Sequence, residues 1–214
     1  MVIFETNLVK GGVDMACTYS CCGCERLQLS PEDRQRLMNR IIDMEADMFV
    51  KVNEGKTDKA ECQTQLKTFR SMRNMSFAVL SDETLQSYYE DLKFAVLDGR
   101  NLVMEKYARM DNLIPPLNDN GLIDEIVRIE KGWMQELHAK YPHAIGMSPQ
   151  FENYEHSELE TYSDETIASY HRDVVTARQM GLNLVEARYK VLYQGMGFKS
   201  LDEVEAKAAT QEAK

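Results

Sequence analysis

The amino-acid sequence predicts an all-α protein, a pseudo-twofold helical bundle built from two repeated helical units and preceded by an irregular, cysteine-rich arm. Apolar residues recur at helical spacing in five long stretches, and almost no stretch shows the alternation with a period of two that is typical of strands. The chain of 214 residues has 5 Pro and 11 Gly, too few for a fold built on tight turns. Its hydrophobic content of 43% is enough for an ordinary globular core.

The charge and hydropathy of the chain exclude two classes of partner. Lys and Arg number 25 and Asp and Glu number 35, so the net charge is −10. A field of this sign repels phosphate backbones and no local basic patch offsets it, so we expect no nucleic-acid partner. No apolar run approaches the roughly 20 residues that cross a bilayer, and the N-terminus lacks the pattern of a signal peptide. We therefore expect a cytoplasmic protein with no membrane partner, and the sequence leaves its oligomeric state open.

The chain divides into three parts. Residues 1–29 show no sustained periodicity and form the expected arm. Residues 30–199 form a single helical domain, with repeat units at 30–112 and 121–195. Residues 200–214 form a short terminal helix and a tail.

The first unit is expected to begin with two helices. Ser30 can cap the first helix, and Pro31 suits its first turn. The apolar stripe continues to Val52, and Gly55 follows as a stop. A second helix is expected over about 58–79. Its inward face consists of Cys62, Leu66, Phe69, Met72 and Phe77.

One long helix is expected after Ser81, ending near residue 110. Its apolar stripe stays in phase through Gly99, which favours an uninterrupted helix in which Gly99 lets a neighbouring helix approach closely. Pro115 and Pro116 then mark a linker. The stripe consists of Leu85, Tyr88, Leu92, Val96, Gly99, Val103 and Met110.

The second unit is expected to repeat this plan. A helix is predicted over about 122–140, and residues 141–161 read as a long ordered loop with room for one short helix. A long helix should then run from its cap at Ser163 to about residue 194, where Gly195 and Gly197 stop it. A capping box that begins at Ser200 predicts the terminal helix.

An internal duplication supports the two units. Residues 81–110 align without gaps to 163–192, with 13 of 30 positions identical, and both segments begin Ser-Asp-Glu-Thr. The preceding helices also resemble each other, at 41–45 and 126–130. We therefore expect two units related by one roughly twofold rotation that pack face to face in one bundle.

The chain resembles an uncharacterised bacterial family of unknown function in four motifs, at Phe69–Arg73, Ser81–Leu85, Gly99–Leu102 and Lys106–Met110. The resemblance covers roughly residues 36–190. It implies an all-helical protein and brings no activity with it. The cysteine-rich arm lies outside the part that resembles the family.

Two carboxylates form the first candidate site. Glu45 and Glu130 lie within apolar stripes at equivalent positions of the two units, where an unpaired carboxylate would be costly or would stay protonated. They could form a polar pocket for a ligand or metal at the axis between the units. Alternatively, Arg70, Arg73 or a tyrosine hydroxyl pairs them structurally. The Glu-x-x-His pattern of a carboxylate-bridged di-metal site is absent, which disfavours a di-iron centre.

The polar face of the two long helices forms the second candidate site. Asn101 and Asn183 occupy matching positions and should either bond across the bundle or contact a ligand. Tyr88 and Tyr170 are expected as core aromatics with a bonded hydroxyl, or as ligand contacts, and His171 as a structural residue or a base. The face contains Ser87, Asp91, Asp98, Asn101 and Glu105 in one helix and Ser169, Asp173 and Asn183 in the other.

Four cysteines of the arm form the third candidate site. Cys17, Cys21 and Cys24 have the spacing of an iron–sulfur loop, and Cys22 is a spare thiol. The spacing is similar to the radical S-adenosylmethionine signature, but that class needs an α/β barrel and this chain predicts only helices. We expect reduced thiols that hold an Fe–S cluster or zinc, or else a thiol-bearing arm without metal.

Two functions remain open from the sequence, and it does not decide whether the protein is an enzyme. The first is a small-molecule binder or enzyme with a polar site between the two units. The alternative is a non-catalytic helical interaction module with a metal- or redox-active cysteine arm. A purely structural bundle follows if every interior polar group is paired within the protein.

Overall fold

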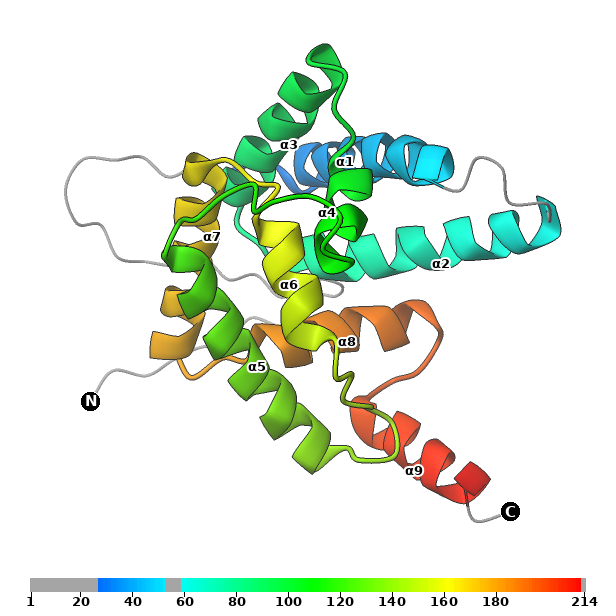
Figure 1. Ribbon diagram of the computed structural model, residues 1–214. Coiled ribbons are helices and arrows are strands. Elements are labelled where there is room, and N and C mark those ends of the chain that lie inside the picture. The colour runs from blue at the N-terminus through cyan, green and yellow to red at the C-terminus, as the bar shows by residue number, and fades with distance from the viewer. Residues whose placement is uncertain (1–26, 53–58, 213–214) are drawn as a thin grey trace.

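A computed structural model describes residues 27–52 and 59–212, and this part of the chain is helical and contains no strand, which confirms the all-α prediction (Figure 1). The helices are α1 (Pro31–Val52), α2 (Lys59–Ala78), α3 (Asp82–Leu97), α4 (Leu102–Met110), α5 (Leu122–Lys140), α6 (Phe151–Leu159), α7 (Asp164–Gln179), α8 (Leu184–Gly195) and α9 (Leu201–Glu212). Within these ranges no helix is long and apolar enough to cross a membrane. Outside the described residues lie most of the arm, the side chain of Cys62 and the candidate metal ligands Cys17, Cys21, Cys22 and Cys24.

Serine caps begin α3 and α7 where the sequence predicts them. The Ser81 hydroxyl accepts a hydrogen bond from the Thr84 backbone N–H at 3.2 Å. The Ser163 hydroxyl accepts the same bond from Thr166, also at 3.2 Å. These bonds satisfy one of the donors that the first turn of a helix leaves open.

The prediction of one long helix through Gly99 is wrong, as is its counterpart in the second unit. Gly99 and Gly181 both have φ of +69°, and the chain turns there before α4 and α8 begin. The Arg100 N–H returns to the Ala95 carbonyl at 2.8 Å, which is the bond that closes a helix ending in a left-handed residue. No heavy atom lies within 4 Å of a Cβ built on Gly99, so backbone conformation and not a close helix approach requires glycine.

The helices pack in two groups that meet along α3 and α7. In the first group α1 contacts α2, α3 and α4, and in the second α5 contacts α6, α7 and α8 (Figure 1). Two further contacts connect the groups, α2 with α8 and α4 with α6. Helix α9 packs against α8. The buried apolar residues of both groups form one core cluster.

Where α3 and α7 meet, an aspartate of each helix accepts hydrogen bonds from the first residues of the other helix. Asp173 of α7 accepts hydrogen bonds from Ser81 N at 2.9 Å and from Thr84 Oγ1 at 2.7 Å. The reciprocal bonds to Asp91 of α3 come from Ser163 N at 3.0 Å and Thr166 Oγ1 at 2.7 Å.

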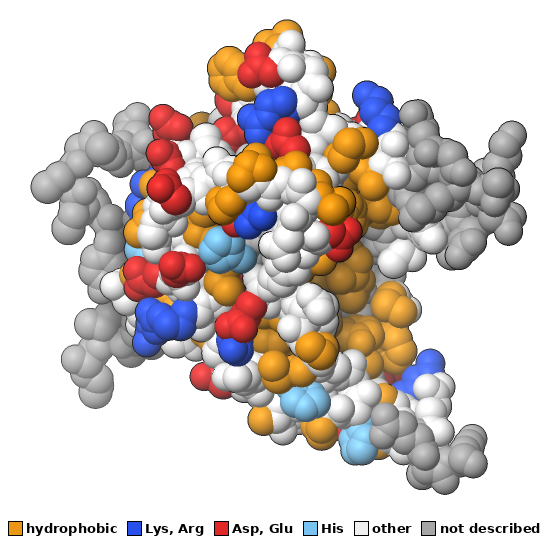
Figure 2. Space-filling view, in the orientation of Figure 1, with side chains coloured by type: hydrophobic (Ala, Val, Ile, Leu, Met, Phe, Trp, Pro, Cys, Tyr) orange, Lys and Arg blue, Asp and Glu red, His pale blue; other side chains and the backbone are white. Residues whose placement is uncertain are grey.

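Besides Gly99, two other residues predicted to face inward are exposed. Met72 lies beside the buried face of α2, which is centred on Phe69 and Phe77. Val96 lies on the last turn of α3. Because the helix ends there, no following turn carries the apolar stripe back to the core, and Val96 remains exposed. Figure 2 shows hydrophobic side chains gathered at this tip of the molecule.

Replacement of Gly99 or Gly181 by Ala should lower the free energy of unfolding by about 1–2 kcal/mol, because an L-residue is strained at positive φ. Gly132 is the matched control, since it lies inside α5 with open space at its Cβ position. Gly132→Ala should raise the free energy of unfolding by about 0.5–1 kcal/mol through helix propensity. Urea unfolding of the three variants measures these changes. A higher free energy of unfolding in all three would contradict the requirement for glycine at positions 99 and 181.

Candidate functional site

Glu45 is buried, as the helical phase of α1 predicts, and it forms an ion pair with an arginine. Glu45 is 2% exposed, and Arg73 of α2 donates to both of its carboxylate oxygens, from Nε at 2.7 Å and Nη2 at 2.8 Å. Tyr88 of α3 donates its hydroxyl to Oε1 at 2.7 Å. The carboxylate is thus paired by an arginine and a tyrosine hydroxyl, two of the partners expected from the sequence.

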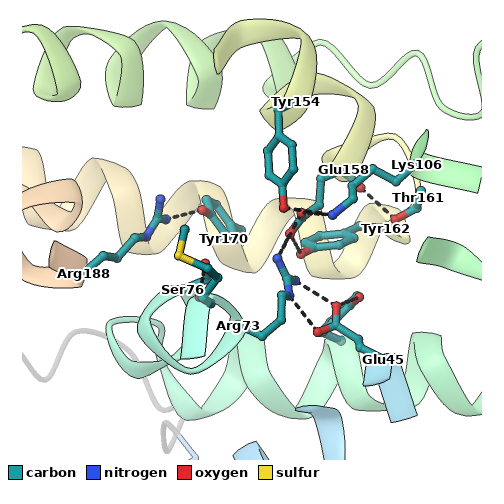
Figure 3. Close-up of polar contacts among 12 residues, drawn as sticks. Glu45, Arg73, Ser76, Lys106, Tyr154, Glu158, Thr161, Tyr162, Tyr170 and Arg188 are labelled. Atoms are coloured by element: carbon teal, nitrogen blue, oxygen red, sulfur yellow. Dashed lines mark hydrogen bonds and ion pairs between the residues drawn. The ribbon is translucent and has the colours of Figure 1, made fainter. Parts of the chain in front are cut away.

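The network continues from Arg73 to helix α6 and beyond. Figure 3 shows the Arg73 guanidinium between Glu45 and Glu158, and its Nη1 lies 2.8 Å from Glu158 Oε1. Lys106 of α4 donates to Glu158 Oε2 at 3.1 Å and to the Tyr154 hydroxyl at 2.9 Å. Tyr162 donates to Glu158 Oε1 at 3.0 Å. One carboxylate of α6 therefore bridges cations from α2 and α4.

These contacts change how easily Glu158 takes up a proton. Burial alone raises the pKa of its carboxyl, but Arg73 and Lys106 outweigh burial and hold the pKa well below its usual range. Glu158 is therefore ionised at neutral pH, and this half of the network contains two anions and two cations.

Glu130 of α5 is fully buried and forms the second buried ion pair. Arg188 of α8 donates to its two oxygens, from Nη1 at 2.9 Å and Nη2 at 2.7 Å. The Tyr170 hydroxyl donates to Oε1 at 2.9 Å and accepts a short hydrogen bond from Arg188 Nη2. Arg188 Nε is buried and has no hydrogen-bond partner within the described ranges.

Glu155 of α6, which is partly buried, is a fourth carboxyl group close enough to Glu130 and Arg188 to interact with their charges. Burial raises its pKa to about 8, helped by the negative charge of Glu130 and opposed by Arg188. Glu155 therefore holds a proton at neutral pH. Burial is the larger cause, and the count of charged groups agrees with it, since three cations (Arg73, Lys106, Arg188) accompany four acids (Glu45, Glu130, Glu155, Glu158).

The matched asparagines cap helices instead of lying inside them. Asn101 accepts the Met104 N–H at the start of α4, and Asn183 accepts the Glu186 N–H at the start of α8. The Nδ2 of Asn101 also donates to the backbone carbonyl of Met48 in α1 at 3.0 Å. The Nδ2 of Asn183 donates in the same way to the carbonyl of Trp133 in α5, also at 3.0 Å. These bonds account for both side chains within the protein.

Two other candidate residues lie outside the buried network. Arg70 is exposed on α2 and pairs with Asp43 at 2.7 Å. His171 is partly buried on α7, and its Nε2 lies 2.9 Å from Glu125. No group of three or more His, Cys, Asp or Glu side chains could hold a metal ion in the part of the chain that the structure describes.

Sequence reasoning missed half of the network. Lys106 and Arg188 could have been found, because they occupy the same position in the two aligned segments and both are buried cations. The α6 residues had no such signal, because they lie in a segment without an apolar stripe. The missed residues are Lys106, Tyr154, Glu155, Glu158, Tyr162 and Arg188.

Comparison with known proteins agrees with the resemblance seen in the sequence motifs. The sequence model of one family, described as "Protein of unknown function (DUF4125)", matches residues 35–206. No curated protein matches the chain, and no solved structure does.

Glu45→Gln should lower the free energy of unfolding by about 3–5 kcal/mol, because it leaves a buried cation without its partner. Asp43→Asn on the same helix is the matched control, since it breaks an exposed ion pair with Arg70. That change should cost less than about 1 kcal/mol. Urea unfolding at pH 7 measures both variants, and similar small losses would show that the buried pair is not stabilising.

The pH dependence of stability should report the proton on Glu155. Its pKa rises from 4.5 to about 8 on folding, so the folded chain holds a proton that the unfolded chain releases. Stability from this group is therefore full below about pH 4.5 and is lost progressively as the pH rises from there to about 8. Relative to Glu155→Gln, the wild type should lose up to about 1.4 kcal/mol of unfolding free energy per pH unit within this window. Urea unfolding at pH 5.5, 7 and 8.5 measures the difference, and a constant difference would contradict the raised pKa.

Proposed function

We propose that the chain, which belongs to this family of unknown function, binds a small molecule in its polar interior between two helical units, beside Glu155, Glu130 and Arg188. One observation carries the proposal. A carboxyl group that keeps its proton lies near a buried guanidinium whose Nε has no acceptor in the described part of the chain. Buried groups with shifted pKa values and unmet hydrogen bonds are characteristic of functional sites.

The ligand that fits these groups carries hydrogen-bond acceptors. A protonated carboxyl donates one hydrogen bond, and the Nε of Arg188 donates a second. With a pKa of about 8, Glu155 is also suited to give up a proton near neutral pH. If the bound molecule is a substrate, Glu155 is the group that acts as general acid.

The same proposal places the site within a pseudo-twofold pair of units. Three pairs of matching features support that relation: equal φ at Gly99 and Gly181, reciprocal bonds to Asp91 and Asp173, and buried carboxylates each paired by an arginine and a tyrosine. The two halves differ in their number of cations. Helix α6 brings one acid to each half, Glu158 to the first and Glu155 to the second. The first half has two cations, Arg73 and Lys106, whereas Arg188 is the cation that pairs with Glu130 in the second.

This difference favours the Glu130 half as the ligand site. In the Glu45 half the anions and cations balance, and the contacts among them account for a structural role. In the Glu130 half one acid is in excess and one guanidinium N–H lacks an acceptor within the described residues. A ligand is needed only where the protein leaves groups unmatched.

A second function, as an interaction module, is favoured by the end of α3. Phe94 is 63% exposed and Leu97 is 79% exposed, and the two lie one turn apart. Large apolar side chains that gather at one exposed place often mark a contact with another protein.

Native mass spectrometry of anaerobically purified protein tests ligand binding. The wild type should carry a retained small molecule, and Glu155→Leu should lose it because leucine offers no hydrogen-bond donor to the ligand. Glu152→Leu is the matched control on α6, since it removes an exposed pair with Lys131. Equal retention in the three proteins, or no bound molecule in the wild type, would contradict the proposal.

A further inference from the structure

A cavity of about 320 Å³ opens between the end of α5, the second half of α8 and the start of α9. Three lysines line it, Lys140 from α5, Lys190 from α8 and Lys199 from the turn before α9. Its size is at the lower end of the range for small-molecule sites. The cavity lies on the face of α8 that points away from Arg188, because Glu186 and Lys190 are each two residues from it along the helix.

Aromatic rings form the apolar wall of this cavity. Tyr141 is buried, and the rings of Tyr193 and Phe198 meet edge to face with centroids 5.9 Å apart. The Tyr193 hydroxyl donates to the Ala144 carbonyl at 3.1 Å, which fixes the ring. A planar apolar group can therefore pack against a wall that is already ordered.

The charges of the lining leave the lysines incompletely paired. A single oxygen of Glu186 lies 2.8 Å from Lys190 Nζ and 3.4 Å from Lys140 Nζ, so one carboxylate serves two ammonium groups. Lys199 has no ion-pair partner among the residues described. Counting Asp202 as well, the lining has three positive and two negative side chains, in a protein whose net charge is −10.

We propose that this cavity binds a small anion that carries an aromatic ring, such as an aromatic carboxylate. Its ring packs against Tyr193 and Phe198, and its charge lies near Lys140 and Lys190, where it competes with Glu186 for the two ammonium groups. This site is separate from the one beside Glu155.

Isothermal titration calorimetry of the full chain with 2-naphthoate tests the charge of the ligand. Two probes of the same shape serve as controls, neutral 2-naphthalenemethanol and cationic 2-naphthylmethylammonium. The anion should bind most tightly and the cation least. The affinity of 2-naphthoate should fall as the NaCl concentration rises from 20 to 300 mM, because salt screens exposed charges. Equal affinity for the three probes, or no binding of the anion, would overturn the proposal.

Three variants test the position of the site. Lys190→Met should weaken 2-naphthoate binding about five-fold, and Glu186→Gln should strengthen it by a similar factor, because it frees both lysines. Lys93→Met is the control, since Lys93 pairs with Glu90 on α3 outside the cavity, and it should leave affinity unchanged. Circular dichroism confirms that each variant is folded. Binding that responds equally to the Lys190 and Lys93 changes, or that weakens in Glu186→Gln, would overturn this assignment.

Discussion

Burial of charge is the constraint on which the interior of this protein depends. Glu45 and Glu130 lie inside the apolar stripes of α1 and α5, where a carboxylate without partners would be strongly unfavourable. Each therefore has an arginine and a tyrosine hydroxyl within hydrogen-bond distance. The partners come from α2 and α3 for one acid and from α7 and α8 for the other. The contacts that neutralise the two acids thus also determine how six helices meet.

Helical periodicity accounts for much of what the sequence predicts. The apolar stripes define the bounds of α1 and α5, and the same phase places Glu45 and Glu130 in the core. Periodicity does not reveal the breaks at Gly99 and Gly181, because the apolar residues after each glycine resume in helical phase. The breaks depend on a positive φ and on backbone hydrogen bonds, and neither leaves a trace in the spacing of apolar residues.

Partner identity is the part of the candidate site that the sequence predicts least. Arg73 and Glu158 are 85 residues apart along the chain, and Glu130 and Arg188 are 58 apart, so no local pattern joins them. The duplication held one usable signal, the cation shared by Lys106 and Arg188. Helix α6 held none, although it supplies a carboxyl group to each half.

The central claim is that Glu155 keeps its proton at neutral pH, because the proposed ligand site lies in the half of the network that contains this acid. The most direct measurement is a carbon-13 NMR titration of the Glu155 side-chain carboxyl, assigned by comparison with Glu155→Gln. The account predicts a midpoint near pH 8, with the proton retained at neutral pH. A midpoint near the ordinary glutamate value of about 4.3 would contradict it, because the acid would then be charged without a matching cation.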